Sequence, residues 1–127
     1  MNETLIQTIS LNNGLTVRFF DASRKIAGDR WQVTLLVRME IPVDAFYLRA
    51  ADLPDASEIR KALGETVIFE VKKQRNFIDE PEKQQTLDNM KETFINISLP
   101  YLSHPEFPKR HIARQFAEHK KRRAWER

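Results

Sequence analysis

The three histidines are the first candidates for chemistry, because imidazole ligates metals and transfers protons near neutral pH. His111 and His119 are eight residues apart, which on a helix separates them by two turns of one face. Two helical side chains that chelate one metal are normally one turn apart. His104 lies in a separate proline-rich segment. We therefore expect solvated or capping histidines, and neither a metal nor a cofactor.

Two acidic clusters have the side chains needed to hold a hard cation or to act as an acid and base pair. Each cluster precedes an apolar pattern of helical period. Carboxylates at the start of a helix accept free amide hydrogens and face the positive end of the helix dipole, so we interpret both clusters as helix caps. The clusters are Asp52, Asp55 and Glu58, and Asp79, Glu80 and Glu82.

Motifs for a nucleophile or a phosphate-binding loop are missing from the sequence. None of its five serines lies in a Gly-x-Ser-x-Gly turn, and its three glycines are widely separated. There is no cysteine, which removes disulfides, thiolate nucleophiles and cysteine-based metal sites. The leading hypothesis is therefore a non-enzymatic protein-interaction or regulatory domain. An alternative is a ligand-binding protein or small enzyme with its cleft at residues 100–108.

The C-terminal end carries the most distinctive electrostatic pattern. Residues 1–108 contain 13 Lys and Arg against 16 Asp and Glu, whereas residues 109–127 contain 8 against 2. A basic segment attracts phosphate backbones, and a tryptophan within it can stack on a base, so nucleic-acid binding is a second hypothesis. The competing interpretation is a helix whose cations face its own dipole or an acidic surface. The candidate nucleic-acid contacts are Lys109, Arg110, Arg114, Lys120, Lys121, Arg122, Arg123 and Trp125.

Length and composition bound the class of protein. A chain of 127 residues that is 41% hydrophobic and 31% charged is typical of one globular domain, here residues 1–127 with a basic helical segment over 108–127. The lack of cysteine fits a reducing compartment. The sequence contains no run of about 18 apolar residues, which is the length that would indicate a membrane span. We expect a cytoplasmic protein with no membrane partner.

The clearest element is a strand from Arg30 to Ile41. Its odd positions from Trp31 onward are apolar and its even positions are polar except Leu36, so one face is predicted to be buried. Before it, two alternating runs flank the turn 12–14 and predict a tight hairpin. After it, the alternation from Thr66 to Lys73 predicts a fourth strand.

Helical patterns follow these strands. The stretch 43–53 fits both a strand and a helical turn, and a short helix is predicted from Asp55 with Gly64 as its stop. A longer helix is predicted from Asp79 to Leu99, ended by Pro100, with an inward stripe at Leu87, Met90, Phe94 and Ile97. The segment 100–108 contains three prolines and should be a stiff connection. The rings of Tyr101, His104 and Phe107 in this segment should pack on the body. A last helix is predicted over 108–123.

Together these elements predict an α+β fold. A four-stranded, mainly antiparallel sheet, made of an N-terminal meander and one later strand, is packed by C-terminal helices. On the even-numbered face of the sheet, four apolar side chains stand among polar ones, which is typical of an interface for a homodimer or protein partner. The alternative is ordinary scattered surface residues or a face covered by a helix. The four residues are Ile6, Phe20, Leu36 and Ile68.

Overall fold

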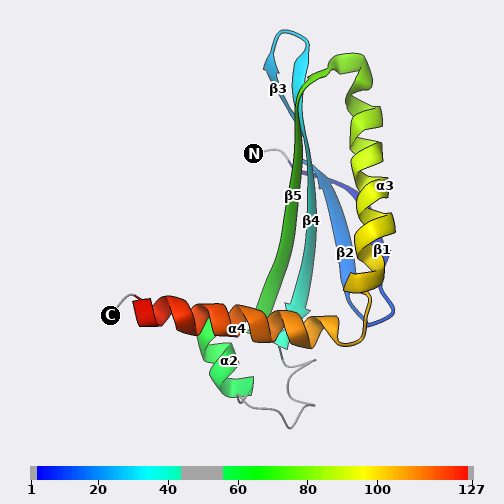
Figure 1. Cartoon of the computed structure of the whole chain (residues 1–127). Coiled ribbons are helices and arrows are strands. Elements are labelled where there is room, and N and C mark those ends of the chain that lie inside the picture. The colour runs from blue at the N-terminus through cyan, green and yellow to red at the C-terminus, as the bar shows by residue number, and fades with distance from the viewer. Residues whose placement is uncertain (1–2, 44–55, 126–127) are drawn as a thin grey trace.

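A computed structural model describes residues 3–43 and 56–125 (Figure 1). An antiparallel sheet and three described helices confirm the predicted α+β class. The elements in chain order are β1 (Thr4–Ser10), β2 (Thr16–Asp21), β3 (Arg24–Ala27), β4 (Arg30–Pro42), α2 (Ala56–Leu63), β5 (Thr66–Asp79), a 3₁₀ turn (Glu80–Glu82), α3 (Lys83–Leu102) and α4 (Phe107–Trp125). Most of the ambiguous stretch 43–53, including Asp52, lies outside the described residues, as does Asp55.

β4 is the centre of the sheet. On one side it pairs with β2 over Leu35–Arg38 and with β3 over Arg30–Gln32, and on the other side it pairs with β5 along nearly its whole length. β1 pairs with β2, and every pairing is antiparallel. The sheet therefore has one strand more than predicted. The additional strand, β3, forms within the charged connection that leads into β4.

The core lies between the odd-numbered face of the sheet and α3, which runs along that face (Figure 1). The alternation in β4 buries its odd side chains, and α3 places Leu87, Met90 and Phe94 over them. The ring of Phe94 meets that of Phe19 edge to face, with centroids 5.9 Å apart. Ile97 lies on the same side of α3 as Met90 but is 73% exposed, so the buried stripe does not extend to it.

Both ends of α3 differ from the prediction. β5 continues through Asp79, whose carboxylate pairs with Arg30, and neither Asp79 nor Glu82 makes a side-chain cap bond. The side-chain cap bonds expected of this acidic cluster are therefore absent at Asp79 and Glu82, although the cluster does lie at the start of the helical segment. Pro100 does not end the helix but lies in its last turn. Pro100 is exposed there, as is Asn96, whose carbonyl loses its helical hydrogen-bond donor because proline has no amide hydrogen.

The predicted hairpin turn ties the sheet to the helices. Gly14 has φ +91°, which an L side chain adopts only with strain, and the Asn13 Oδ1 accepts a hydrogen bond from the Leu15 amide at 3.1 Å. The Asn13 Nδ2 donates to the carbonyl of Leu102 at 2.8 Å and to that of His104 at 3.0 Å. The β1–β2 hairpin thereby holds the connection between α3 and α4 in place.

α4 crosses the N-terminal end of β5 and packs against α2 (Figure 1). Its buried residues all come from its first half and are Phe107, Pro108, His111, Ile112 and Phe116. From Ala117 to Trp125 no residue is buried, and the C-terminal end of the helix extends past α2 and the sheet in Figure 1.

Candidate functional site

The connection between α3 and α4 is packed around Phe107 and forms only a shallow hollow with β1. The ring of Phe107 is buried, with ring centroids 5.2 Å from Tyr101, 5.6 Å from Phe69 and 5.6 Å from His111. A shallow hollow of about 390 Å³ beside Pro100 has no ionisable side chain in its described lining. The segment 100–108 therefore holds α4 on the body, and its ionisable residues His104 and Glu106 do not line the hollow.

His111 is a buried structural residue. Its imidazole bonds the backbone carbonyl of Ile68, and its Nε2 has no hydrogen-bond partner. Burial lowers the pKa of His111, and the nearby charge of Arg114 lowers it further. The ring is therefore neutral at physiological pH. Within residues 3–43 and 56–125, no group of three or more His, Asp or Glu side chains is placed to hold a metal ion.

The predicted nucleic-acid contacts divide between the two halves of α4. Lys109, Arg110 and Arg114 belong to the half that packs on the body, although Arg110 and Arg114 are exposed. The other candidates lie in the half that extends past the body. Four consecutive cations there are exposed and form no ion pair with any described residue; they are Lys120, Lys121, Arg122 and Arg123. Trp125 follows them and is 82% exposed.

Cations occupy two sides of the α4 surface. At about 100° per residue, Arg110, Arg114, Lys121 and Trp125 fall within roughly 60° of one another, on a stripe about 22 Å long. The Lys120 ammonium lies over the ring of Phe116, 5.4 Å from its centroid. On that side Lys120 and Arg123 line a shallow groove with residues of α2, namely Glu58, Lys61 and Ala62. The second half of α4 thus presents positive charge over most of its circumference.

The predicted interface residues on the sheet are not all on the surface. Ile68 is 49% exposed, Ile6 is 38% exposed and Phe20 is half-buried, but Leu36 is only 6% exposed. Leu36 lies on the central strand directly between its cross-strand partners, Phe20 of β2 and Lys72 of β5. Leu36 is therefore a core residue. None of the described helices lies on this face, which is opposite α3 (Figure 1).

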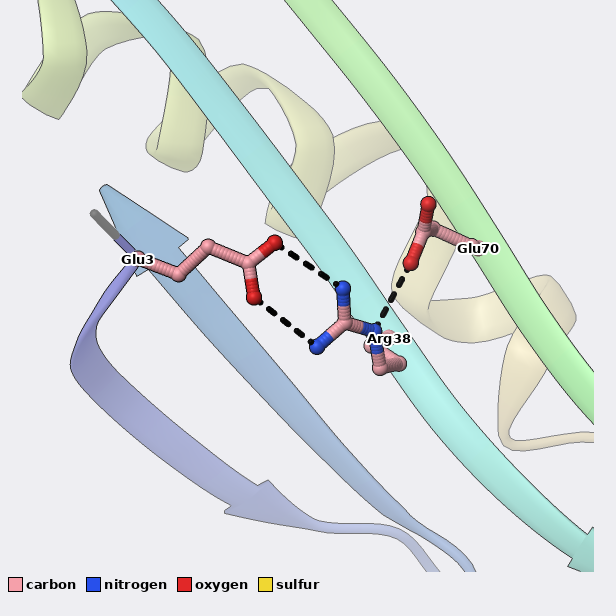
Figure 2. Close-up of polar contacts among 3 residues, drawn as sticks. All are labelled: Glu3, Arg38 and Glu70. Carbon is pink, nitrogen blue, oxygen red and sulfur yellow. Dashed lines mark hydrogen bonds and ion pairs between the residues drawn. The ribbon is translucent and has the colours of Figure 1, made fainter. Parts of the chain in front are cut away.

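A charge cluster occupies the middle of the same face (Figure 2). The Arg38 guanidinium donates two hydrogen bonds of 3.3 Å to Glu3 and one of 2.7 Å to Glu70, and it lies over the Phe20 ring, 4.9 Å from the centroid. The bond with Glu3, followed by that with Glu70, raises the pKa of Arg38. These residues are far apart in the sequence, and only the strand register brings them together.

A strained aromatic residue lies on β5. Asn76 and Phe77 together face Gln32 alone, which defines a β-bulge. Phe77 has φ +60°, a conformation that costs a bulky side chain roughly 1–2 kcal/mol, and its side chain is 72% exposed. Glycine or asparagine at this position would have indicated the bulge in the sequence, whereas phenylalanine gave no such indication.

Comparisons of the chain with protein-family models, with curated proteins and with solved structures find no match. None of the described helices is both long enough and apolar enough to cross a bilayer. The arguments for function therefore rest on the arrangement of the chain's own residues.

Proposed function

We propose that this protein binds nucleic acid through α4, chiefly through its second half, residues 117–125. The observation that carries the proposal is the row of four exposed cations, Lys120 to Arg123, on a helical segment that extends beyond the body. Such a row can approach a phosphate backbone without rearrangement of the fold. The absence of catalytic motifs and of cysteine supports a non-enzymatic role in the cytoplasm.

Two structural explanations of the basic helix account for less of the pattern. Docking on an acidic surface would bury or pair the cations, yet none of the four pairs with a described carboxylate. Interaction with the helix dipole stabilises cations only in the last turn, which explains Arg122 and Arg123 but not Arg110 or Arg114. A polyanionic partner explains all of these positions.

The partner is recognised mainly by charge. Nucleic acids carry closely spaced phosphates, and lysine and arginine that neutralise them release condensed counterions. Trp125 lies at the end of the stripe formed by Arg110, Arg114 and Lys121, where its ring is available to stack on an unpaired base. The arrangement favours single-stranded nucleic acid bound with little sequence preference.

Fluorescence anisotropy with labelled single-stranded RNA and DNA of about 20 nucleotides tests the proposal. If about four cations contact phosphates, the affinity should fall roughly 50-fold between about 50 mM and 200 mM salt. The double variant Arg114→Glu with Lys121→Glu should lose most of this affinity. Trp125→Ala should weaken binding by about tenfold if the ring stacks on one base.

The matched control is Lys25→Glu with Lys72→Glu, which changes the net charge equally at exposed positions of the sheet. An equal loss in this control would show that only net charge matters and would contradict a site on α4. Absence of binding at low salt would contradict the proposal entirely. Binding to vesicles of anionic lipid, but to neither oligonucleotide, would assign the helix to a membrane surface instead.

A second candidate function is self-association through the even-numbered face of the sheet. The specific observation is the exposed apolar surface of Leu5, Ile6 and Ile68 on a face that no described helix covers. Leu5 belongs to this face because it pairs with Phe20 across the β1–β2 hairpin. Light scattering on a sizing column should then show a dimer for the wild type and a monomer for Ile68→Lys. A monomeric wild type at about 100 μM would remove this candidate, since a stable interface has a dissociation constant well below that concentration.

A further inference from the structure

β5 is an edge strand, and the middle of its outer edge is open. Within the described residues its only strand partner is β4. α4 crosses its beginning, where His111 bonds the carbonyl of Ile68 and the rings of Phe69 and His111 are in contact. From Glu70 to Phe77, no other described element pairs with the strand.

Backbone hydrogen bonds of the sheet show which groups of β5 face outward. The Val43 amide donates to the Glu65 carbonyl at 2.9 Å, and the Thr34 carbonyl accepts from the Ala22 amide at 3.0 Å, so even-numbered residues of β4 direct their backbone groups away from β5. The register pairs even-numbered residues of β4 with even-numbered residues of β5 without interruption from Thr66 to Arg75. Alternate residues of an antiparallel strand direct their backbone groups to the same side. Glu70, Lys72 and Gln74 therefore present free amides and carbonyls at the edge, which is a template for a further strand.

A groove of about 440 Å³ lies directly beside this edge, between β5 and α3. Its floor contains the buried side chains of Met90 and Phe94, and Ile97 borders it while largely exposed to solvent. Lys73 and Arg75 border it on the β5 side. Like Val71, they occupy odd-numbered positions of β5, and alternate side chains of a strand share a face. Their side chains therefore lie on the sheet face that α3 covers.

The charge of the groove is one-sided. Lys73 and Arg75 are both exposed, and no carboxylate lies among the described residues that line the groove. The remaining polar lining consists of amides and hydroxyls, such as those of Asn89 and Thr93. An occupant with negative charge and some apolar side chains complements these walls and this floor.

We propose that an extended acidic peptide binds at this place, as an additional strand on β5 whose side chains on the α3 side enter the groove. The edge from Glu70 to Phe77 accommodates a strand of about eight residues, roughly 27 Å long. Its backbone would pair with Glu70, Lys72 and Gln74. Its acidic side chains would meet Lys73 and Arg75, and its apolar ones would cover Ile97.

The same charges disfavour a second copy of this chain as the occupant. Two β5 strands paired edge to edge would place lysines and arginines of one copy close to those of the other. Lysine on an edge strand is a common device against unwanted strand pairing. Here it disfavours basic strands while favouring acidic ones, so the same residues give both protection and recognition.

Two labelled synthetic peptides of about eight residues test the proposal by fluorescence anisotropy. One alternates aspartate with valine, and the other has asparagine in place of aspartate. The acidic peptide should bind at least about tenfold more tightly, because the neutral one lacks both charge contacts. Failure of the acidic peptide to bind at about 1 mM would overturn the proposal.

Variants locate the peptide on the groove side of β5. Lys73→Glu with Arg75→Glu should abolish binding of the acidic peptide, whereas Lys72→Glu should leave it within about threefold, because the Lys72 side chain lies on the opposite face of the sheet. An equal loss in both variants would place the binding elsewhere. These variants leave α4 unchanged, so oligonucleotide binding by the same preparations distinguishes this site from the proposed nucleic-acid site and reports that the protein is folded.

Backbone pairing is tested separately from charge. Amide hydrogen exchange followed by NMR should show new protection at Lys72 and Gln74 when the acidic peptide is bound, while Val71 and Lys73, already paired with β4, change little. An acidic peptide methylated on alternate backbone nitrogens should bind at least about tenfold more weakly if those nitrogens pair with β5. Tight binding of the methylated peptide without new protection would identify a site for small anions and overturn strand addition.

Discussion

The two halves of α4 differ in whether their inward positions are apolar. Ile112 and Phe116 continue the helical stripe that begins at Phe107 and keep the first half on the body. The same period next requires apolar residues near 119, 120 and 123, where the chain has His119, Lys120 and Arg123. The second half consequently buries no side chain, although Lys120 and Arg123 still border a shallow groove with α2. In this helix the side-chain type at a few inward positions separates a structural segment from a candidate binding segment.

The largest expected effect is loss of the aromatic packing that holds the first half. Phe107→Ala removes a buried ring that touches Phe69, Tyr101 and His111, and should lower the free energy of unfolding by about 3–5 kcal/mol. Urea unfolding followed by circular dichroism measures it. Tyr101→Ala, at a half-exposed ring of the same cluster, is the matched control. If the two variants lost equal stability, burial of Phe107 would not be what holds α4.

The buried imidazole gives the first half a pH dependence. Burial lowers the folded-state pKa of His111 below the ordinary value of 6.5, so the unfolded chain binds the proton first as the pH falls. The free energy of unfolding should therefore decrease below about pH 6.5 and stop responding to this residue once the pH is below the folded-state pKa. His111→Phe should flatten this part of the pH profile, measured by urea unfolding between pH 8 and pH 5. A comparable flattening in His119→Gln, on the second half, would contradict the assignment.

The fold was predictable where one residue pattern determines one local structure. Alternation from Trp31 to Ile41 indicated β4, and the turn at Gly14 indicated the β1–β2 hairpin. The ends of α3 were not predictable in this way, because Pro100 is tolerated in an exposed last turn and Asp79 is taken up by a cross-strand pair with Arg30. Both outcomes depend on neighbours that are distant in the sequence.

The candidate sites were predictable only in part. The basic residues of α4 could be recognised from composition, but only the structure shows that the helix buries nothing after Phe116. The groove beside β5 could not be predicted, because Lys73 and Ile97 are brought together by the placement of α3 on the sheet. Leu36 was predicted to lie on the surface but is only 6% exposed. Strand alternation shows which face of the sheet a side chain is on, but not how much of it the neighbouring strands leave exposed.

The bulge on β5 contrasts with the first half of α4, because its aromatic residue is exposed where Phe107 is buried. Phe77→Gly should raise the free energy of unfolding by about 1 kcal/mol, since glycine adopts φ +60° without strain and the ring buries little surface. Thermal and urea unfolding measure the change. Phe77→Ala is the control, because it removes the ring but keeps the unfavourable backbone conformation. A destabilised glycine variant would show that the ring stabilises the fold by more than the strain costs.

The smallest expected effect is removal of the second half of α4. A chain that ends at Ala117 keeps every buried residue of the described structure. It lacks the Lys120 ammonium over the Phe116 ring, an interaction worth roughly 0.5–1 kcal/mol at an exposed site. The free energy of unfolding should therefore fall by less than about 1 kcal/mol, as measured by urea unfolding. A decrease comparable to that of Phe107→Ala would mean that the basic segment stabilises the fold. The contrast between the halves would then disappear, because fold stability alone would account for the charges that we assign to a nucleic-acid partner.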